Sequence, residues 1–137
     1  MADPVTITLV SVSYPEVHFT SESGQPGTQV ETELGLNFHW HRENNHLFMV
    51  SMDLRVSSSE GRTILTVQAM AHFQTNAIVD EEFRNGPYVR INAPTMVYPF
   101  LRAFIGTFMT SAGFPPIYLP SFNFMEPGIP MTDRSSH

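Results

Sequence analysis

Four segments in the first half of the chain alternate apolar and polar residues, which is the pattern of half-buried β-strands. They cover residues 5–19, 30–40, 47–57 and 63–74, and residues 58–62 form a predicted hairpin turn. The second segment is the clearest, because one side of it carries only Val30, Thr32, Leu34, Leu36, Phe38 and Trp40. The four segments therefore predict an antiparallel meander with one apolar face.

The first segment departs from a regular strand at two points. Its alternation slips near Val10 and Ser11, which predicts a β-bulge. Pro15 has no backbone N–H to donate to a neighbouring strand, so it predicts an edge position for this segment.

One helix is predicted in the second half, over residues 95–112, with Thr95 as its N-cap and Gly113 just past its end. At about 100° per residue its apolar side chains fill an arc of about 180°, and they are Val97, Phe100, Leu101, Phe104, Ile105, Phe108 and Met109. A stripe of about 100° is enough to cover one sheet. We therefore expect the helix to be buried twice, by its own sheet and by another subunit. A single-chain core with irregular edges is the alternative.

Strands followed by a helix predict an α+β fold, with a four-stranded antiparallel sheet and one long helix on one face. The 137 residues suit one domain. Within it we predict strands over about 4–78, a charged linker at 79–94 and the helix. An apolar extended arm at 113–124 and a loose tail at 125–137 complete the chain.

Composition excludes several classes of function. The net charge is −6 and all seven basic side chains are arginines without a basic cluster, which argues against a nucleic-acid partner. The chain has no cysteine, so disulfide and thiol chemistry are excluded. No apolar run reaches the roughly 20 residues of a membrane span, and the first residues lack the basic segment of a signal peptide. We therefore expect a cytoplasmic protein without membrane insertion.

Candidate chemistry is sparse. His39 and His41 share one side of the second strand and His46 follows across a turn, which is a weak zinc pattern. Solvated histidines are the favoured interpretation, so no metal is expected. The sequence contains no nucleophile motif, glycine-rich phosphate loop or other catalytic signature, and the acidic run at 80–82 suits a solvated linker. We expect a non-enzymatic protein without cofactors.

The helix and arm resemble SecB, the bacterial export chaperone family. The shared pattern is Tyr-Pro-Phe-Leu-Arg-Ala-Phe-Ile at 98–105, Phe-Pro-Pro-Ile-Tyr-Leu at 114–119 and Asn-Phe at 123–124. Weaker likeness extends to residues 17–19, 34–36 and 67–68. The resemblance implies the α+β fold, a homodimer paired through edge strands and a tetramer whose helices pack between sheets.

The resemblance also implies an ATP-independent holdase that keeps unfolded or pre-export polypeptides in apolar grooves. The predicted peptide-binding row on the second strand is Thr32, Leu34, Leu36, Phe38 and Trp40. The predicted oligomer interface on the helix is Val97, Leu101, Phe104, Ile105, Phe108 and Met109. Eleven phenylalanines and eight methionines suit a surface that adapts to varied clients.

Two departures from the family pattern affect the expected partners. After residue 124 the chain reads Met-Glu-Pro-Gly, where the family continues into a second helix and a tail that binds the translocase motor SecA. At positions implied to contact the motor, Glu16 and Ile64 are present, but Thr20 and Thr66 are uncharged. We therefore expect weak or absent motor binding. Two alternatives stay open: a SecB-like chaperone of a toxin–antitoxin pair, and a small-ligand module with a pocket between sheet and arm.

Overall fold

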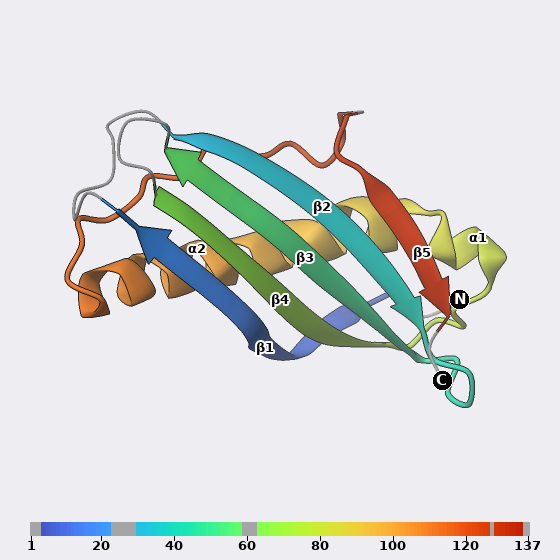
Figure 1. The fold of residues 1–137 in the computed structure, drawn as a ribbon. Coiled ribbons are helices and arrows are strands. Elements are labelled where there is room, and N and C mark those ends of the chain that lie inside the picture. The colour runs from blue at the N-terminus through green and yellow to red at the C-terminus, as the bar shows by residue number, and fades with distance from the viewer. Residues whose placement is uncertain (1–3, 23–29, 59–62, 127, 136–137) are drawn as a thin grey trace.

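The computed structural model describes residues 4–22, 30–58, 63–126 and 128–135. Its strands form one sheet in the order β1-β4-β3-β2-β5 (Figure 1). Their bounds are β1 Ile7–Ser21, β2 Glu31–Trp40, β3 Leu47–Ser58, β4 Thr63–Thr75 and β5 Met131–Ser135. The first four are antiparallel neighbours, and β5 runs parallel to β2. The α+β fold is confirmed, but the prediction of a four-stranded sheet is wrong because the C-terminal segment adds a fifth strand.

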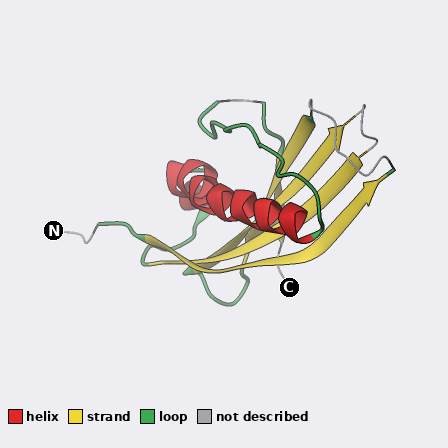
Figure 2. Ribbon diagram, turned by 90° about the vertical axis from the view of Figure 1, so that its left-hand side faces the viewer, coloured by secondary structure: helices red, strands yellow, loops and turns green. Residues whose placement is uncertain are grey.

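Three helical elements follow β4: α1 (Glu81–Arg84), a π-helical turn η1 (Tyr88–Asn92) and α2 (Ala93–Ser111). The long helix α2 crosses one face of the sheet, and no helix among the described residues covers the other face (Figure 2). Gly113 follows α2 with φ +89°, the left-handed conformation that ends many helices and that glycine adopts without strain.

The core lies between α2 and the inner face of the sheet. The alternation in the sequence reappears as burial, with every second residue of β3 and β4 buried along most of their length. Helix α2 contributes fully buried side chains at a spacing of four residues, namely Val97, Leu101, Ile105 and Met109. That spacing places them along one side of the helix.

Strand β1 confirms both predictions made for it. Its pairing with β4 shifts between Leu9 and Ser11. It shifts again between Ser13 and Glu16, the interval that contains Pro15. Within the described sheet β1 pairs only with β4, so it is an edge strand. Its inward side chains pack on the helix, where Tyr14 stacks on Phe104 at 4.0 Å between ring centroids.

The apolar arm after α2 is anchored to the start of the helix. The Tyr98 hydroxyl donates a hydrogen bond to the Pro120 carbonyl oxygen, and the rings of Phe122 and Phe124 meet the Tyr98 ring edge to face. Leu119 and Phe124 are buried, so the arm contributes to the core without forming regular structure.

The predicted start of the helix is wrong. The Thr95 hydroxyl donates to the Ile91 carbonyl at 2.7 Å, which is a bond within a helical run and not an N-cap. Helical turns begin before Thr95: Pro87 is the N-cap of η1, and Pro94 lies in the first turn of α2, where a missing N–H costs little. The charged segment 80–92 therefore contains two helical elements, α1 and η1, and the Asp80 carboxylate caps α1 by accepting a 2.8 Å bond from Phe83 N–H.

The prediction of a loose tail at 125–137 is also wrong over Met131–Ser135, which forms β5. The predicted hairpin turn at 58–62 falls largely outside the described residues.

Candidate binding surfaces

The predicted peptide-binding row of β2 lies inside the chain. Leu34, Leu36, Phe38 and Trp40 are at most 7% exposed, and only Thr32 is half-buried. Two guanidinium groups cover the aromatic end of the row: Arg90 Cζ lies 4.3 Å from the Phe38 ring centroid and Arg84 Cζ lies 5.0 Å from that of Trp40. A client can therefore contact this row only at its Thr32 end or after a local rearrangement. The assignment of the row to client binding stays a prediction.

The predicted oligomer interface on α2 divides into two groups. The four fully buried residues of the interface face the sheet of their own chain. Phe104 and Phe108 are half-buried against β1, and the neighbouring Phe100 is 51% exposed. Any contact of α2 with a second subunit would therefore involve the phenylalanine side of the helix, and the interface stays a prediction.

An open apolar hollow of about 720 Å³ lies where β1 begins and α2 starts. Its walls come from residues around the start of β1, from η1 and the first turn of α2, and from the end of the arm. The lining residues are Val5, Ile7, Tyr88, Ile91, Asn92, Thr95, Met96, Phe122, Asn123, Phe124 and Met125. Sequence reasoning missed this surface because it took residues 80–92 for a linker.

The anchored Tyr98 supports one wall of this hollow. Burial raises the pKa of its hydroxyl above the ordinary value, while nearby Arg102 acts in the opposite direction. The hydroxyl therefore stays protonated at neutral pH and remains a donor to the Pro120 carbonyl.

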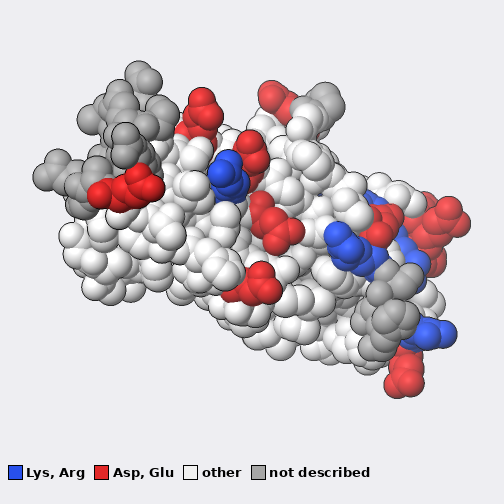
Figure 3. All heavy atoms as spheres, viewed as in Figure 1, with Lys and Arg blue, Asp and Glu red and all other residues white. Residues whose placement is uncertain are grey.

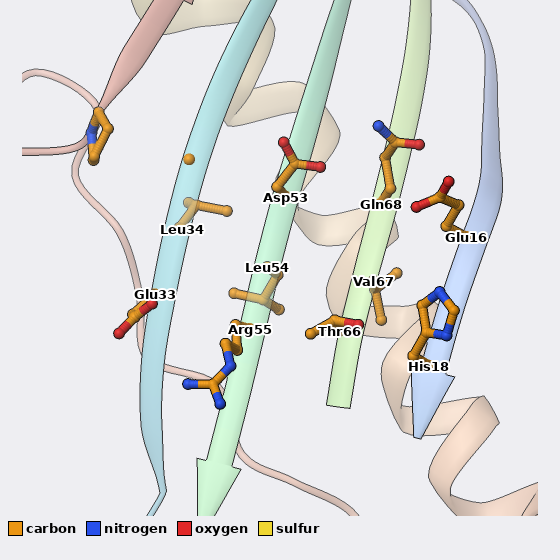
Figure 4. Close-up of a pocket in the computed structure, with 12 residues that line it drawn as sticks. Glu16, His18, Glu33, Leu34, Asp53, Leu54, Arg55, Thr66, Val67 and Gln68 are labelled. Atoms are coloured by element: carbon orange, nitrogen blue, oxygen red, sulfur yellow. The ribbon is translucent and has the colours of Figure 1, made fainter. Parts of the chain in front are cut away.

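The outer face of the sheet carries an acidic hollow of about 350 Å³ (Figure 4). Glu16 and His18 of β1, Asp53 and Arg55 of β3 and Glu33 of β2 line it. Its floor includes Gly35, where the place of a side chain is open space. Figure 3 shows Asp and Glu side chains over this face, while most Arg side chains gather at the end where β5 lies.

Of the two residues predicted to contact the translocase motor, Glu16 lines the acidic hollow. Ile64 lies farther along β4, opposite Thr20 of β1, and is 40% exposed. The two side chains therefore share the outer face but do not share one hollow, and their role stays a prediction.

A second hollow of about 410 Å³ on the outer face contains His39, His41 and His72 above apolar residues. Its position follows from the register, which aligns His39, Met49 and His72 across three strands. The third histidine of the predicted pattern, His46, lies elsewhere and its Nδ1 is 3.2 Å from the Thr75 carbonyl oxygen. Across the described part of the chain, no group of three or more histidine, aspartate or glutamate side chains is placed to share a metal ion.

His39 has a distinct environment within that hollow. Its Nε2 lies 3.1 Å from the Ser51 hydroxyl oxygen. Burial lowers the pKa of His39, nearby Arg134 and His72 lower it further, and Asp53 opposes them. The imidazole is therefore neutral at physiological pH.

No helix among the described residues is long and apolar enough to cross a membrane.

Comparisons with known proteins identify a family. The family model "SecB: Preprotein translocase subunit SecB" matches residues 7–126. The protein-export protein SecB of Hyphomonas neptunium is 25% identical over 130 residues, covering 90% of this chain and 77% of the relative. The SecB of Neorickettsia sennetsu is 28% identical over 131 residues, covering 88% and 77%.

Other relatives align over a shorter segment with a higher sequence identity. The SecB of Herminiimonas arsenicoxydans is 42% identical over 52 residues, which is 38% of this chain and 30% of that protein. The chain thus matches less than a third of that relative's length.

Solved structures confirm the fold. A Mycobacterium tuberculosis SecB-like chaperone, solved in complex with a peptide from the HigA1 antitoxin, superposes with a TM-score of 0.69 at 12% identity. The superposition covers 85% of this chain and 88% of that one. A Streptococcus agalactiae protein of unknown function gives a TM-score of 0.55 at 11% identity, with 87% and 100% covered. Because the SecB model spans nearly all the described strands and helices, the chain belongs to the SecB family.

Proposed function

We propose that this protein is an ATP-independent holdase that binds unfolded polypeptides and keeps them from aggregating. The observation that carries the proposal is the open apolar hollow of about 720 Å³ between the start of β1, the start of α2 and the arm. An unfolded client offers extended backbone and scattered apolar side chains, and an apolar surface with methionine and aromatic side chains accommodates such variety. Family membership supports the same function.

Exposed apolar side chains extend this surface beyond the hollow. Tyr118 on the arm is 85% exposed, and Ile78 and Phe100 each keep more than half of their surface accessible. Such side chains are costly to leave in water unless a partner covers them. Clients and further copies of the chain are the proposed partners.

The proposed assembly is a homo-oligomer, a tetramer built as a dimer of dimers. The outer edge of β1 has no strand partner in the described sheet, so it offers backbone groups for pairing with a second β1. The phenylalanine side of α2 offers a second contact. A solution mass near 15.4 kDa by light scattering at micromolar concentration would contradict the assembly.

Two cellular roles are compatible with holding clients. Delivery to the export machinery is supported by the names of the SecB relatives and by the acidic outer face. Of the positions that the family resemblance assigns to motor contact, however, only Glu16 and Ile64 are proposed to take part. Service to a toxin–antitoxin pair is supported by the similar fold of the M. tuberculosis chaperone bound to an antitoxin peptide. Calorimetry against SecA separates these roles, because we expect weak or no binding to the motor.

The test of holdase activity is suppression of aggregation. Several unrelated proteins, unfolded in denaturant and diluted into buffer, should scatter less light when this protein is present at a comparable molar concentration, without ATP. Serum albumin at equal mass controls for nonspecific crowding. If the aggregation of all substrates proceeds unchanged, the holdase proposal is wrong and a small-ligand module becomes the better explanation of the hollow.

A further inference from the structure

Strand β5 is a small addition to an otherwise complete sheet. It has five residues, Met131–Ser135, and the side chains at 131–134 are exposed, so none of them enters the core. Its backbone lies along the edge of β2 in parallel register, with Leu36 opposite Met131 and Phe38 opposite Asp133. The Leu36 N–H also donates a 2.9 Å bond to the Pro130 carbonyl. β5 is therefore attached through its backbone and not through apolar packing.

Polar contacts complete the attachment of β5. Arg90 binds the Asp133 carboxylate with two hydrogen bonds, Nη1 to Oδ1 at 2.8 Å and Nη2 to Oδ2 at 3.1 Å. On the outer face, Arg134 Nε donates to Asn37 Oδ1 at 3.0 Å. The Asp133 side chain is 52% exposed, so water can compete for this ion pair.

Arg90 is positioned by its own helical segment, independently of β5. Its Nε donates to the Arg84 carbonyl at 2.8 Å, and its guanidinium lies over the Phe38 ring. Beside it, the Arg84 guanidinium lies over Trp40, and Arg84 Nε is buried without a hydrogen-bond partner among the described residues. The edge of β2 thus holds a fixed cationic group that a carboxylate of any adjacent strand could bind.

Without β5, the edge of β2 would expose unpaired backbone groups next to buried Leu36, Phe38 and Trp40 and the fixed Arg90. An extended polypeptide satisfies all three features, since it supplies backbone partners, side chains and, where it contains Asp or Glu, a carboxylate. We propose that β5 occupies a strand-pairing site for clients, and that an extended client segment with an acidic residue displaces it and binds Arg90. This inference rests on the proposed holdase function.

The exchange of strands is favourable for a client with apolar side chains. One set of backbone hydrogen bonds replaces another, so the client's side chains must supply the free energy that offsets its loss of translational freedom on binding. None of the side chains of residues 131–134 is buried, whereas a client can offer apolar side chains of its own. The apparent affinity for clients is reduced by the fraction of molecules in which β5 is docked.

The variant Asp133→Asn tests this inference, because it removes the charge and keeps the shape of the side chain. Glu82→Gln is the matched control, which neutralises one exposed carboxylate of α1. The probe is fluorescently labelled, reduced and carboxymethylated α-lactalbumin, a chain that cannot refold. Anisotropy titration should show about threefold to fivefold tighter binding to Asp133→Asn than to wild type, with Glu82→Gln unchanged.

Hydrogen exchange of the same proteins reports whether β5 is released. Amides of residues 131–135 should exchange faster in Asp133→Asn, while those of β3 and β4 keep their protection. If β5 stays docked in this variant, Thr132→Pro takes its place, because proline removes a strand N–H. A released β5 with unchanged probe affinity overturns the inference. If the wild type and every variant fail to bind the probe, the holdase proposal itself has failed.

Synthetic peptides test the acidic preference. Two peptides with the sequence of residues 129–135 are compared, one with Asp133 and one with Asn at that position. The variant protein in which β5 is released should bind the Asp peptide at least several-fold more tightly than the Asn peptide. Equal affinities for the two peptides would overturn the role assigned to Arg90.

Discussion

The two edges of the sheet are built in opposite ways. β1 is 15 residues long and packs a row of half-buried side chains on the helix, with Tyr14 stacked on Phe104 and Phe19 meeting Phe108 and Phe114 edge to face. β5 has five residues and is held by backbone pairing and two arginine contacts. Apolar packing makes the β1 edge part of the folding unit. The polar attachment of β5 makes the other edge exchangeable.

This difference separates two tasks on one sheet. Local opening takes place where few apolar contacts are lost, because such segments unfold at lower free energy than the global transition. β5 meets that description and β1 does not. We therefore expect β1 to serve permanent contacts, such as pairing with a second subunit, and the β2 edge to serve transient ones.

The largest effect is expected from charging the boundary between β2 and β5. Leu36→Arg should unfold the protein, because Leu36 is 1% exposed and an unpaired charge at such a site costs at least about 4 kcal/mol. Its register partner provides the control: Met131→Arg should stay folded, since Met131 is 36% exposed. Circular dichroism of both variants checks this. A folded Leu36→Arg variant that no longer binds clients would instead favour an open groove at this strand.

A smaller effect is expected at the β1 edge. Phe19→Ala should lower the free energy of unfolding by about 2 kcal/mol, less than for a fully buried phenylalanine because Phe19 is half-buried. Urea denaturation measures the change, with Thr20→Ala on the outer face as the control. A loss below about 0.5 kcal/mol would show that the β1 edge is no better packed than β5.

Global stability should change little at the β5 edge. Asp133→Asn should lower the free energy of unfolding by less than about 1 kcal/mol, because the ion pair with Arg90 is partly exposed. The same urea experiment checks it. A loss above about 2 kcal/mol would mean that β5 belongs to the cooperative core, which would remove the contrast between the edges.

The smallest effect is on the titration of His39, whose register partner is Arg134 of β5. Its folded pKa is lowered, first by burial and then by Arg134, so the unfolded chain binds more protons near the ordinary value of 6.5. Stability from His39 is therefore complete above that value and is lost as the pH falls through it toward the folded pKa. Releasing β5 with Asp133→Asn should raise the His39 pKa, as followed by NMR, while Asp53 and His72 stay in place. An unchanged pKa would show that Arg134 has not moved away.

The sequence predicted the main sheet and the long helix because their signals are local. Alternation in residues 30–40 and 47–57 translates directly into the burial of β2 and β3, and the slip at Val10 and Ser11 appears as a bulge. Proline at position 15 correctly indicated an edge strand. Each of these features depends on residues that are neighbours along one strand.

The missed features depend on distant partners. The segment containing β5 has no apolar alternation, and it becomes a strand because β2, about 95 positions earlier, offers an unpaired edge. Arg90 and Asp133 are 43 positions apart and lie in segments predicted as a linker and a tail. Part of the apolar arc of α2 faces the core and part faces β1. Which residues belong to each part depends on where the helix lies on the sheet, and the periodicity of the sequence does not give that position.

Hydrogen exchange of the wild-type protein, measured with and without a saturating unfolded client, tests the account most directly. Reduced and carboxymethylated α-lactalbumin serves as the client, and aggregation assays on the same preparation verify that it is held. We predict that the amides of residues 131–135 lose protection when the client binds, while those of β2 stay protected by the strand that replaces β5. Unchanged protection of residues 131–135 with the client bound would contradict the claim that clients take the place of β5.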